Sequence, residues 1–397
     1  MISWYQPAPI GPGFYAELVR SFVEYGHEIE VIAQACSGSA AYDQKILNVY
    51  GVKIHRLPTD PGSSVVLPNA RQFKIVTNFI KCVLNRQKRM DALPDVFIFG
   101  HEYWVWYKAA LEDYEIPFIV NLRGAPTRLV IQKKFTPQDT ELFLSFLHAS
   151  HYIVSVSKTF EKFLIDNGIP QTKVTTIDNG IDLSLFHPIS TFQKESEVQR
   201  LNKKRQQLNI PITNKIIINI SMHYHHKRVI DFVISGLIVL EQNKDITYVI
   251  VGEGPETKQI LDLINTSRYA DHFIYLGAQE HRQVPDLLKM SDLFVLCSDG
   301  EGFPRVVLEA FASGLLTLIP QTTQTIEFTD NDTRAMSYHL GDCCHLAKKT
   351  LDAIQLSHST RQRMIIHALQ FVRTSCSFDV QVFKYINLIN RLIIVSG

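Results

Sequence analysis

Short runs of apolar residues alternate with amphipathic segments along most of the first half of the chain. The apolar runs are typical of buried strands and cover residues 2–5, 28–33, 52–57, 96–99, 118–122 and 152–155. Helical patterns, such as residues 14–25, separate these runs. Strands that alternate with helices pair in parallel through crossover connections, so the pattern predicts a doubly wound parallel sheet.

The same alternation starts again in the second half, after a break in the pattern near residues 179–188. A polar, charged helix is predicted at residues 193–207. Further strands are predicted at residues 215–220, 246–251, 273–276, 293–297 and 315–320. We therefore expect a second sheet of the same kind, with helices between its strands.

Chain length agrees with this division, because 397 residues exceed the size at which a single hydrophobic core stops growing. We place the first domain at residues 1–190 and the second at residues 191–377. The apolar helix within residues 378–397 is expected to pack back on the first domain. The predicted fold class is α/β, with two Rossmann-like, doubly wound domains facing a cleft.

Composition and charge narrow the classes of function. Hydrophobic residues make up 46% of the chain and charged residues 20%, as in ordinary globular proteins. With a formal net charge of only +1, the chain has no overall positive electrostatic potential that would attract nucleic acid. No apolar run reaches the roughly 20 residues that cross a bilayer, and the first residues resemble a strand rather than a signal segment. We therefore expect a cytoplasmic protein.

Six cysteines are present, at positions 36, 82, 297, 343, 344 and 376. They show no CxxC spacing, and most have apolar neighbours in the sequence. This pattern favours reduced, buried thiols over a disulfide framework or a zinc site.

Candidate chemistry is concentrated in residues 292–320, where a predicted strand leads through a polar loop into a helix. Glu301 lies in the loop and Glu309 on the helix, with seven residues between them. Open α/β sheets bind ligands at the carboxyl ends of their strands, and a helix N-terminus there suits a phosphate. The structural alternative pairs Glu309 with Arg305 on the surface, contributing about 0.3 kcal/mol, and gives Glu301 a helix-dipole role.

These residues are part of a series of landmarks that resembles the retaining GT-B glycosyltransferases of glycosyltransferase family 4 (the group 1 type). Gly252 and Gly254 stand in a turn similar to the family's VGxGP, and the resemblance assigns both to donor binding. The next strand and helix are also similar. The segment 292–314 resembles the family's E-x7-E segment. Several landmarks in order are far more specific than one glycine motif.

The first half resembles the family more loosely. Similar residues occur in the loop that contains Gly11 and Gly13, and at residues 26–28, 94–96 and 179–182. The resemblance therefore covers most of the chain and is stronger toward the C-terminal half.

The resemblance implies a hexosyltransferase-type enzyme that moves a sugar from a nucleoside-diphosphate sugar donor to an acceptor with retention of anomeric configuration. Glu309 would accept hydrogen bonds from the ribose hydroxyls, and Glu301 would contact the donor sugar as a catalytic residue. Gly302, Phe303 and Pro304 would lie beside the donor. A carboxylate suits this role because it only accepts hydrogen bonds and can hold two hydroxyls.

The resemblance also implies an acceptor that is a glycan or a lipid-linked glycan, bound near Gly11 and Gly13. In this family the donor's own diphosphate oxygen takes the acceptor's proton. No strong protein base, no metal and no other cofactor are therefore expected.

One departure from the family pattern affects phosphate binding. Family members carry an Arg and, five residues later, a Lys after the first strand of the second domain. Here Lys227 fits the Lys position, and Met222 stands at the Arg position. An arginine fork bonds a phosphate twice in a geometry that lysine does not reproduce. We assign Lys227 to the diphosphate and to catalysis. The candidate substitutes for the arginine are Arg228, His223 and His225.

In the first domain, a family histidine at a strand end near the donor sugar corresponds to Arg123. His101 lies at the end of another predicted strand. Both residues are catalytic candidates, and a structural or solvent-facing role is the alternative for each.

Two features imitate metal ligands. His223, His225 and His226 share one loop, but no acidic partner is near them in the sequence. The triplet at residues 330–332 imitates the DxD of the other glycosyltransferase fold, but it follows no predicted strand. We interpret both features as polar loop residues.

Residues 61–90 contain six Lys or Arg and no acidic residue. Apolar residues recur there at helical spacing, namely Phe73, Val76, Ile80, Val83 and Met90. Three lysines stand beside them: Lys74, Lys81 and Lys88. One interpretation is a helix that covers the sheet and has a solvated basic face. The other is that residues 69–90 dock peripherally on an anionic membrane, where each basic residue contributes about 1 kcal/mol.

Two other functions stay open at this point. One is a sugar-nucleotide epimerase or phosphorylase of the same fold, against which the spacing of Glu301 and Glu309 argues. The other is a catalytically inactive nucleotide-binding partner subunit, which Met222 and Arg123 favour because they replace family residues.

Overall fold

The computed structural model describes residues 2–3, 14–34, 39–57, 70–100, 107–123, 127, 130–131, 133–189, 194–322 and 325–396. The chain forms two compact units. Unit 1 comprises Met1–Gly180 together with Phe378–Gly397, and unit 2 comprises Ile181–Ser377. The boundary after Gly180 lies earlier than the predicted boundary at residue 190. Unit 2 begins there because the Ile181 N–H donates to the Cys376 carbonyl at 2.8 Å, next to the point where the chain leaves the unit.

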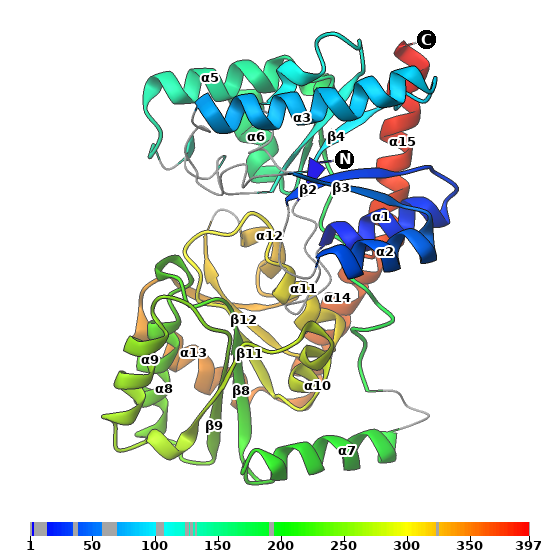
Figure 1. Cartoon of the computed structure of the whole chain (residues 1–397). Helices are drawn as coiled ribbons and strands as arrows, with labels where there is room; N and C mark the ends of the chain where they lie inside the picture. Colours follow the sequence, from blue (N-terminus) through cyan, green and yellow to red (C-terminus); the bar gives the residue numbers. More distant parts are fainter. Residues whose placement is uncertain are drawn as a thin grey trace. The chain divides into compact units, whose positions relative to one another are not determined.

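Unit 1 is built around a parallel sheet of seven strands in the order β3-β2-β1-β4-β5-β6-β7. Three of these strands, β2, β3 and β4, are labelled in Figure 1. The strands are β1 (Ile2–Ser3), β2 (Glu30–Gln34), β3 (Lys53–Leu57), β4 (Phe97–Phe99), β5 (Phe118–Leu122), β6 (Tyr152–Ser155) and β7 (Val174–Thr176). Neighbouring strands pair in parallel, which confirms the predicted arrangement. The sequence missed β7, a three-residue edge strand with one buried side chain.

Helices cover both faces of this sheet. They are α1 (Phe14–Glu24), α2 (Ser39–Tyr50), α3 (Ala70–Arg89), α5 (Pro137–His148), α6 (Lys158–Asp166) and α15 (Phe378–Ser396). Ile119 of β5 packs in the core with α1 and α15, whereas Phe118 and Val120 pack in the core with α3 and α5. A strand buried on both faces has this continuous apolar character because its successive side chains point to opposite layers.

Helix α3 has the predicted apolar face, with one exception. Val76, Ile80 and Val83 are buried against the sheet, and Phe73 packs at the edge of the same core. Met90 follows the end of the helix and is exposed. Its assignment to the apolar face was therefore wrong, because the helix ends before the spacing reaches it.

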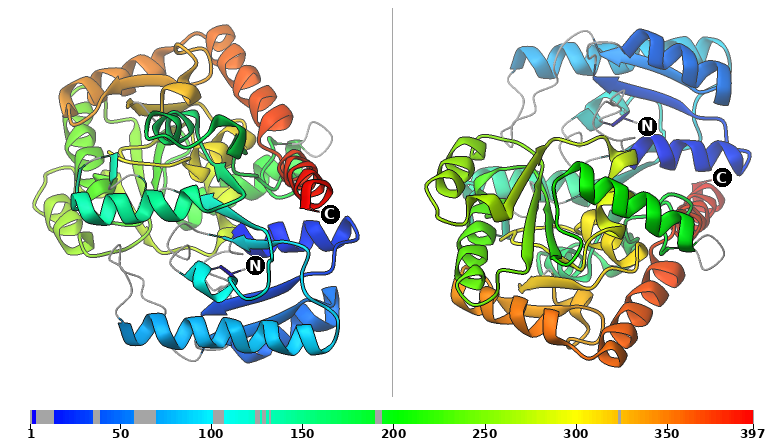
Figure 2. Two further views of the ribbon diagram at one scale, coloured as in Figure 1. Left: turned by 90° about the horizontal axis from the view of Figure 1, so that it is seen from above. Right: turned by 90° about the horizontal axis from the view of Figure 1, so that it is seen from below.

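The last helix of the chain, α15, belongs to unit 1. It lies beside α1 (Figure 2). The residues that it buries in the core are Phe378, Val382, Tyr385, Leu388 and Leu392. The Tyr385 hydroxyl donates to Asn121 Oδ1 on β5 at 3.0 Å. Gly180 permits the close approach of the helix, because a Cβ at this position would lie 2.6 Å from Cδ1 of Phe378.

Unit 2 contains a parallel sheet of six strands in the order β10-β9-β8-β11-β12-β13. The strands are β8 (Lys215–Ile220), β9 (Ile246–Val251), β10 (Phe273–Gly277), β11 (Leu293–Val295), β12 (Thr317–Gln321) and β13 (Met336–His339). The five predicted strands are confirmed. The sequence missed β13, an edge strand in which polar and apolar residues are mixed.

The helices of unit 2 are α7 (Lys194–Gln207), α8 (Val229–Leu240), α9 (Thr257–Asn265), α10 (Val284–Lys289), α11 (Arg305–Ala312), α12 (Ile326–Thr329), α13 (Cys343–Gln355) and α14 (His358–Ser375). Helix α13 packs along α8. Both contribute to one core with the strands, in which Val229, Phe232 and Leu346 are fully buried.

The cysteines that the structure describes are free thiols. Cys297 and Cys376 are buried, and burial raises the pKa of the Cys297 thiol to about 12. Cys82 and Cys344 are exposed because both lie on outer helix faces, so the expectation of buried thiols is wrong for these two. Cys36 lies outside the described residues. Among the described residues, no helix is long and apolar enough to cross a bilayer.

The burial of α15 leads to a prediction about stability. Leu388→Ala removes a side chain that is 5% exposed and leaves a cavity, so we expect a loss of about 2–4 kcal/mol of unfolding free energy. Ile394, 78% exposed on the same helix, is the matched control, and Ile394→Ala should cost less than about 0.5 kcal/mol. Urea unfolding followed by circular dichroism measures both. Equal effects would contradict the packing of α15 in this core.

Candidate functional site

Three loops meet at the carboxyl edge of the unit 2 sheet, after the neighbouring strands β9, β8 and β11. The His226 carbonyl of the β8 loop accepts the Asp299 N–H at 2.9 Å and the Ser298 hydroxyl at 3.2 Å, both from the β11 loop. On the other side, the His223 carbonyl accepts the Glu256 N–H at 3.0 Å, after the β9 turn. Main-chain bonds therefore fix the three loops to one another.

The turn after β9 packs directly on the β8 loop, and only glycine fits there. Gly252 has φ +122°, and a Cβ at this position would lie 1.9 Å from the Ser221 carbonyl oxygen. A Cβ on Gly254 would lie 2.8 Å from the carbonyl oxygen of His223. The Gly254 N–H donates to Thr257 Oγ1 at 2.8 Å. The two predicted binding glycines thus have a structural reason: they let two loops share one layer.

Lys227 and Glu301 are brought together at this edge. Lys227 Nζ donates to Glu301 Oε1, which joins the β8 loop to the β11 loop. The side chains are 21% and 15% exposed, so each charge is largely removed from water and is compensated by the other. The salt bridge lies at the carboxyl edge of the sheet, where open α/β sheets bind ligands.

Glu309 is buried on α11, with 7% of its surface exposed. Its Oε1 lies 3.0 Å from Nε2 of His281, a residue of the short 3-10 helix His281–Gln283 that follows β10. The His281 ring packs against Phe186, with centroids 5.1 Å apart. These contacts contradict the alternative in which Glu309 is half of a surface ion pair with Arg305.

Sequence reasoning missed His281. Its partner Glu309 is 28 positions later in the chain, and the two meet only because α10 and α11 pack together. Nothing in the residues around His281 signals this contact.

Gly302, Phe303 and Pro304 form the buried end of the β11 loop. The Phe303 ring packs on Phe328, with centroids 4.7 Å apart, so its side chain anchors the loop in the core. Helix α11 begins after Pro304, and within the described part of the chain no side chain bonds its N-terminus as a cap. The first N–H groups of a helix have no partner within the helix, so this end suits an anion.

The three candidate substitutes for the missing arginine have other roles in the structure. Arg228 donates from Nε to Asp231 Oδ2 at 2.7 Å. His223 is fully buried and bonds Thr257 Oγ1 through Nδ1 at 2.9 Å. Burial lowers the pKa of the His223 imidazole, although nearby glutamates oppose the shift. His225 is exposed and bonds Glu256 at 2.9 Å. Met222 itself is exposed.

The candidates in unit 1 are only partly described. Arg123 lies at the carboxyl end of β5, where Nη1 donates to Asn179 Oδ1 and Nη2 donates to the Tyr385 hydroxyl at 3.4 Å. These bonds tie β5 to the end of unit 1 and to α15, which is a structural use of the guanidinium. His101, Gly11 and Gly13 lie outside the described residues.

The two features that imitate metal ligands are polar loop residues in the structure. His223 and His225 bond separate partners, and His226 stacks on Tyr224 with centroids 6.0 Å apart. Residues 330–332 form a turn with φ values of 47°, 55° and 61°, in which Asp330 pairs with Arg334.

Two Rossmann-like units with parallel sheets define the chain as a GT-B glycosyltransferase in fold. Residues 201–370 match the family model described as Glycosyl transferases group 1, and residues 14–185 match the one described as Glycosyltransferase Family 4. The chain belongs to this family of glycosyltransferases.

Two similar curated proteins carry the names of different enzymes. The N-acetyl-alpha-D-glucosaminyl L-malate synthase of Bacillus anthracis is 25% identical over 300 residues, 75% of this chain and 72% of that protein. The N,N'-diacetylbacillosaminyl-diphospho-undecaprenol alpha-1,3-N-acetylgalactosaminyltransferase of Campylobacter jejuni is 32% identical over 190 residues, 47% of this chain and 46% of that protein.

Solved structures share the fold over nearly the whole chain. Anabaena HepE in complex with UDP and glucose has a TM-score of 0.76 at 16% identity and covers 98% of both chains. A glycosyltransferase from Rickettsia africae has a TM-score of 0.77 at 16% identity and covers 96% of this chain and 94% of that one.

The packing of the β9 turn leads to a second prediction. Gly252→Ala would place a Cβ against the Ser221 carbonyl, and we expect unit 2 to lose about 2–4 kcal/mol of stability. Gly277→Ala is the control, because φ is +65° there but the nearest atom would be 3.8 Å away. It should cost about 1 kcal/mol. Thermal unfolding compares the two variants, and the prediction fails if Gly277→Ala proves the more damaging.

Proposed function

We propose that the chain transfers a sugar from a nucleoside-diphosphate sugar to an acceptor hydroxyl, with retention of anomeric configuration and without a metal ion. The observation that carries the proposal is the joining of Lys227 to Glu301 beside the uncapped start of α11. Both charges stand at the carboxyl edge of a parallel sheet, where this fold class binds nucleotides. Similarity to a protein solved with UDP and glucose supports the choice of donor.

Lys227 and Glu301 are proposed to exchange partners when the donor binds. The ammonium group turns to the diphosphate, and the carboxylate turns to a hydroxyl of the donor sugar. The bond from C1 to the diphosphate oxygen breaks, the acceptor oxygen bonds C1 on the same face, and the acceptor proton passes to a diphosphate oxygen. Lys227 and the first N–H groups of α11 stabilise the charge that grows on the leaving group.

Glu309 is proposed to bind the ribose. One of its oxygens bonds His281, and a carboxylate has acceptor capacity left for hydroxyl groups. His281 is a positioning residue in this scheme, because it holds the carboxylate and does not itself contact the donor. In unit 1, Arg123 and His101 are kept as proposed catalytic residues, and Gly11 and Gly13 are proposed to bind the acceptor.

A glycan or lipid-linked glycan is the proposed acceptor. The Campylobacter jejuni relative carries a diphospho-undecaprenol acceptor in its name, which supports a lipid carrier. Helix α3 supports membrane docking, because Lys74 and Lys88 are exposed on it. Lys81, between them, pairs with Asp113 at 2.6 Å and is thus already compensated.

One observation favours a second candidate function. Met222 is 55% exposed where the family has a phosphate-binding arginine, and none of the three candidate substitutes is joined to the Lys227–Glu301 pair. An inactive partner subunit that still binds nucleotide would likewise lack a cation in place of the phosphate-binding arginine.

A donor panel tests the proposal. The purified chain is incubated with UDP-, GDP- and ADP-sugars, with and without lipid extract as acceptor and with excess EDTA. We expect release of one nucleoside diphosphate that rises with acceptor and persists in EDTA. Nucleotide binding without release identifies the inactive subunit. Loss of release in EDTA contradicts the metal-free scheme, and an inverted product contradicts retention.

Glu309→Gln keeps the size of the side chain and removes its charge. We expect kcat/KM for the donor to fall roughly ten- to hundredfold, the effect of losing a hydrogen bond to a charged group. The preference for a ribose donor over its 2′-deoxy analogue should fall with it, and His281→Ala should weaken the same preference. Glu241→Gln, on an exposed residue of unit 2, is the control. An unchanged ribose preference in Glu309→Gln removes the assigned role.

Vesicle sedimentation tests the membrane proposal. Replacing Lys74 and Lys88 by Glu should weaken binding to anionic vesicles by at least tenfold, because each basic residue near the surface contributes about 1 kcal/mol. Replacing Lys158 and Lys162, exposed on α6, makes the same charge change elsewhere in unit 1. If the parent chain does not sediment, or both pairs act alike, α3 is a solvated cover helix.

A further inference from the structure

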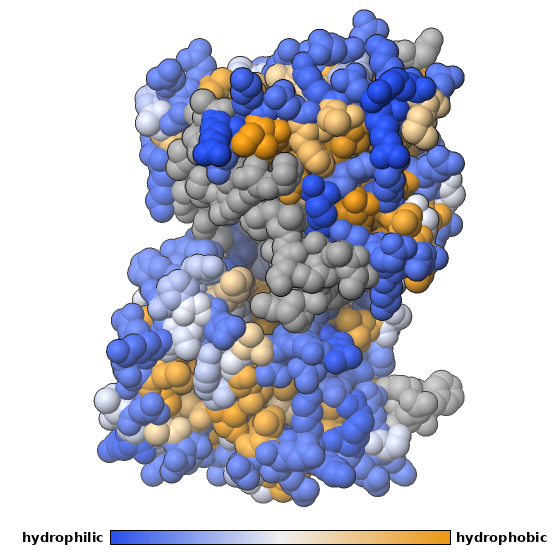
Figure 3. Space-filling view, viewed as in Figure 1, coloured by the Kyte–Doolittle hydropathy of each residue, from blue (hydrophilic) through white to orange (hydrophobic). Residues whose placement is uncertain are grey.

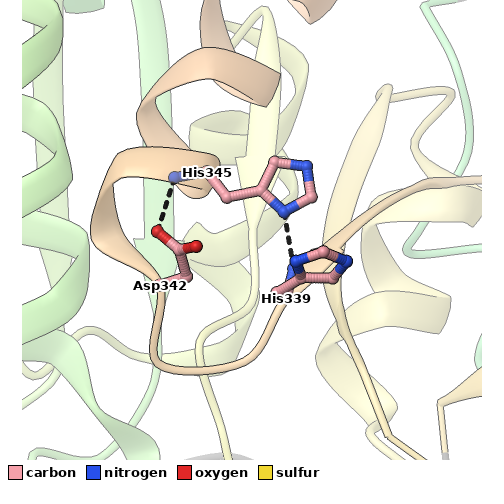
Figure 4. A group of neighbouring side chains, drawn as sticks. All are labelled: His339, Asp342 and His345. Atoms are coloured by element: carbon pink, nitrogen blue, oxygen red, sulfur yellow. Dashed lines mark hydrogen bonds between the residues drawn. The ribbon is translucent and has the colours of Figure 1, made fainter.

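Three potential metal ligands gather where β13 runs into α13, at the outer end of the unit 2 sheet. His339 is the last residue of β13, Asp342 is the N-cap of α13, and His345 lies in the first turn of that helix. Figure 4 shows their side chains on one side of the connecting turn. The ligand atoms, one from each residue, all lie within 4.8 Å of one another.

Hydrogen bonds already orient this cluster. The His345 N–H donates to Asp342 Oδ1 at 2.8 Å, which caps the helix and fixes the carboxylate (Figure 4). The His339 N–H donates to Nδ1 of His345 at 3.1 Å. Since Nδ1 accepts this bond, the neutral ring carries its proton on Nε2, and Nδ1 is the nitrogen that a metal ion would take in place of the His339 N–H. The two imidazole rings are in contact, with centroids 4.2 Å apart.

We propose that His339, Asp342 and His345 form a binding site for a divalent transition metal ion of the zinc type. Two imidazoles and one carboxylate are a ligand set that such ions prefer, and a water would complete a tetrahedron. Tetrahedral zinc places its ligand atoms about 3.3 Å apart, so the side chains must close by on the order of 1 Å. His339 and Asp342 are exposed and can rotate to do so.

The site is separate from the proposed donor site and does not depend on glycosyl transfer. Its effect in the fold would be to join the end of β13 to the start of α13. The turn between them includes Gly341, where a Cβ would lie 3.1 Å from Nη2 of Arg228. Metal binding would therefore fix the turn against which the Arg228 side chain packs. Arg228 directly follows Lys227 in the chain.

Isothermal titration of the tag-free chain with ZnCl2, after EDTA treatment and dialysis, tests the site. We expect one zinc ion per chain with a dissociation constant on the order of micromolar or below, and a higher unfolding temperature with zinc. Asp342→Asn keeps a capping oxygen and removes the charge, so it should leave the metal-free unfolding temperature nearly unchanged. The affinity should fall at least tenfold in Asp342→Asn and in His339→Ala.

Two controls make the test specific. His367→Ala changes an exposed histidine on α14, and Cys344→Ala removes the exposed thiol beside His345. Both should bind zinc as the parent does. The proposal is overturned if the parent binds no zinc, if Asp342→Asn and His339→Ala bind it unchanged, or if Cys344→Ala abolishes binding. Weak binding that is equal in all variants identifies an adventitious ion only.

Discussion

The close packing of the β9 turn on the β8 loop is the constraint on which the carboxyl edge of unit 2 depends. A side chain at Gly252 would collide with the Ser221 carbonyl, so the two loops can share a layer only through glycine. The Gly252 N–H is used by the Gly277 carbonyl at 2.8 Å, which adds β10 to the same layer. The β8 loop, fixed in this way, holds the β11 loop through the His226 carbonyl. Lys227 and Glu301 meet because each lies close in sequence to these anchored atoms.

The sequence was most informative where periodicity and local motifs agree. Strands β8 and β9 are mostly apolar runs, and the segment through Glu301 and Glu309 gives a strand, a loop and a helix in the order observed. Such patterns predict elements because burial on both faces demands them. β7 and β13 escape this logic, because they are three and four residues long and mix polar with apolar residues, which leaves no period to detect.

Only those features of the site that depend on residues close together in the sequence could be predicted. Lys227, Glu301 and Glu309 were found because a family motif places them, but their partners are set by packing between distant segments. The His281 contact is one case. Arg228 is another case. It adjoins Lys227 in sequence, but its backbone is left-handed, at φ 51°, and its side chain forms an ion pair with Asp231 instead of joining the Lys227–Glu301 pair. Residues that are adjacent along a loop need not have adjacent side chains, and no local residue pattern predicts which partner each side chain contacts.

The chain leaves unit 1 at Gly180 and returns to it only at Phe378. A ribosome delivers residues in order, so the surface of α1 that α15 covers must wait for nearly the whole chain to be synthesised. Unit 2 is continuous in sequence and can complete its core earlier. The core that packs α3 and α5 on the unit 1 sheet needs only residues up to Val174, whereas the core under α1 is completed last, when α15 is made. A chain that stopped before Phe378 would leave the apolar face of α1 uncovered.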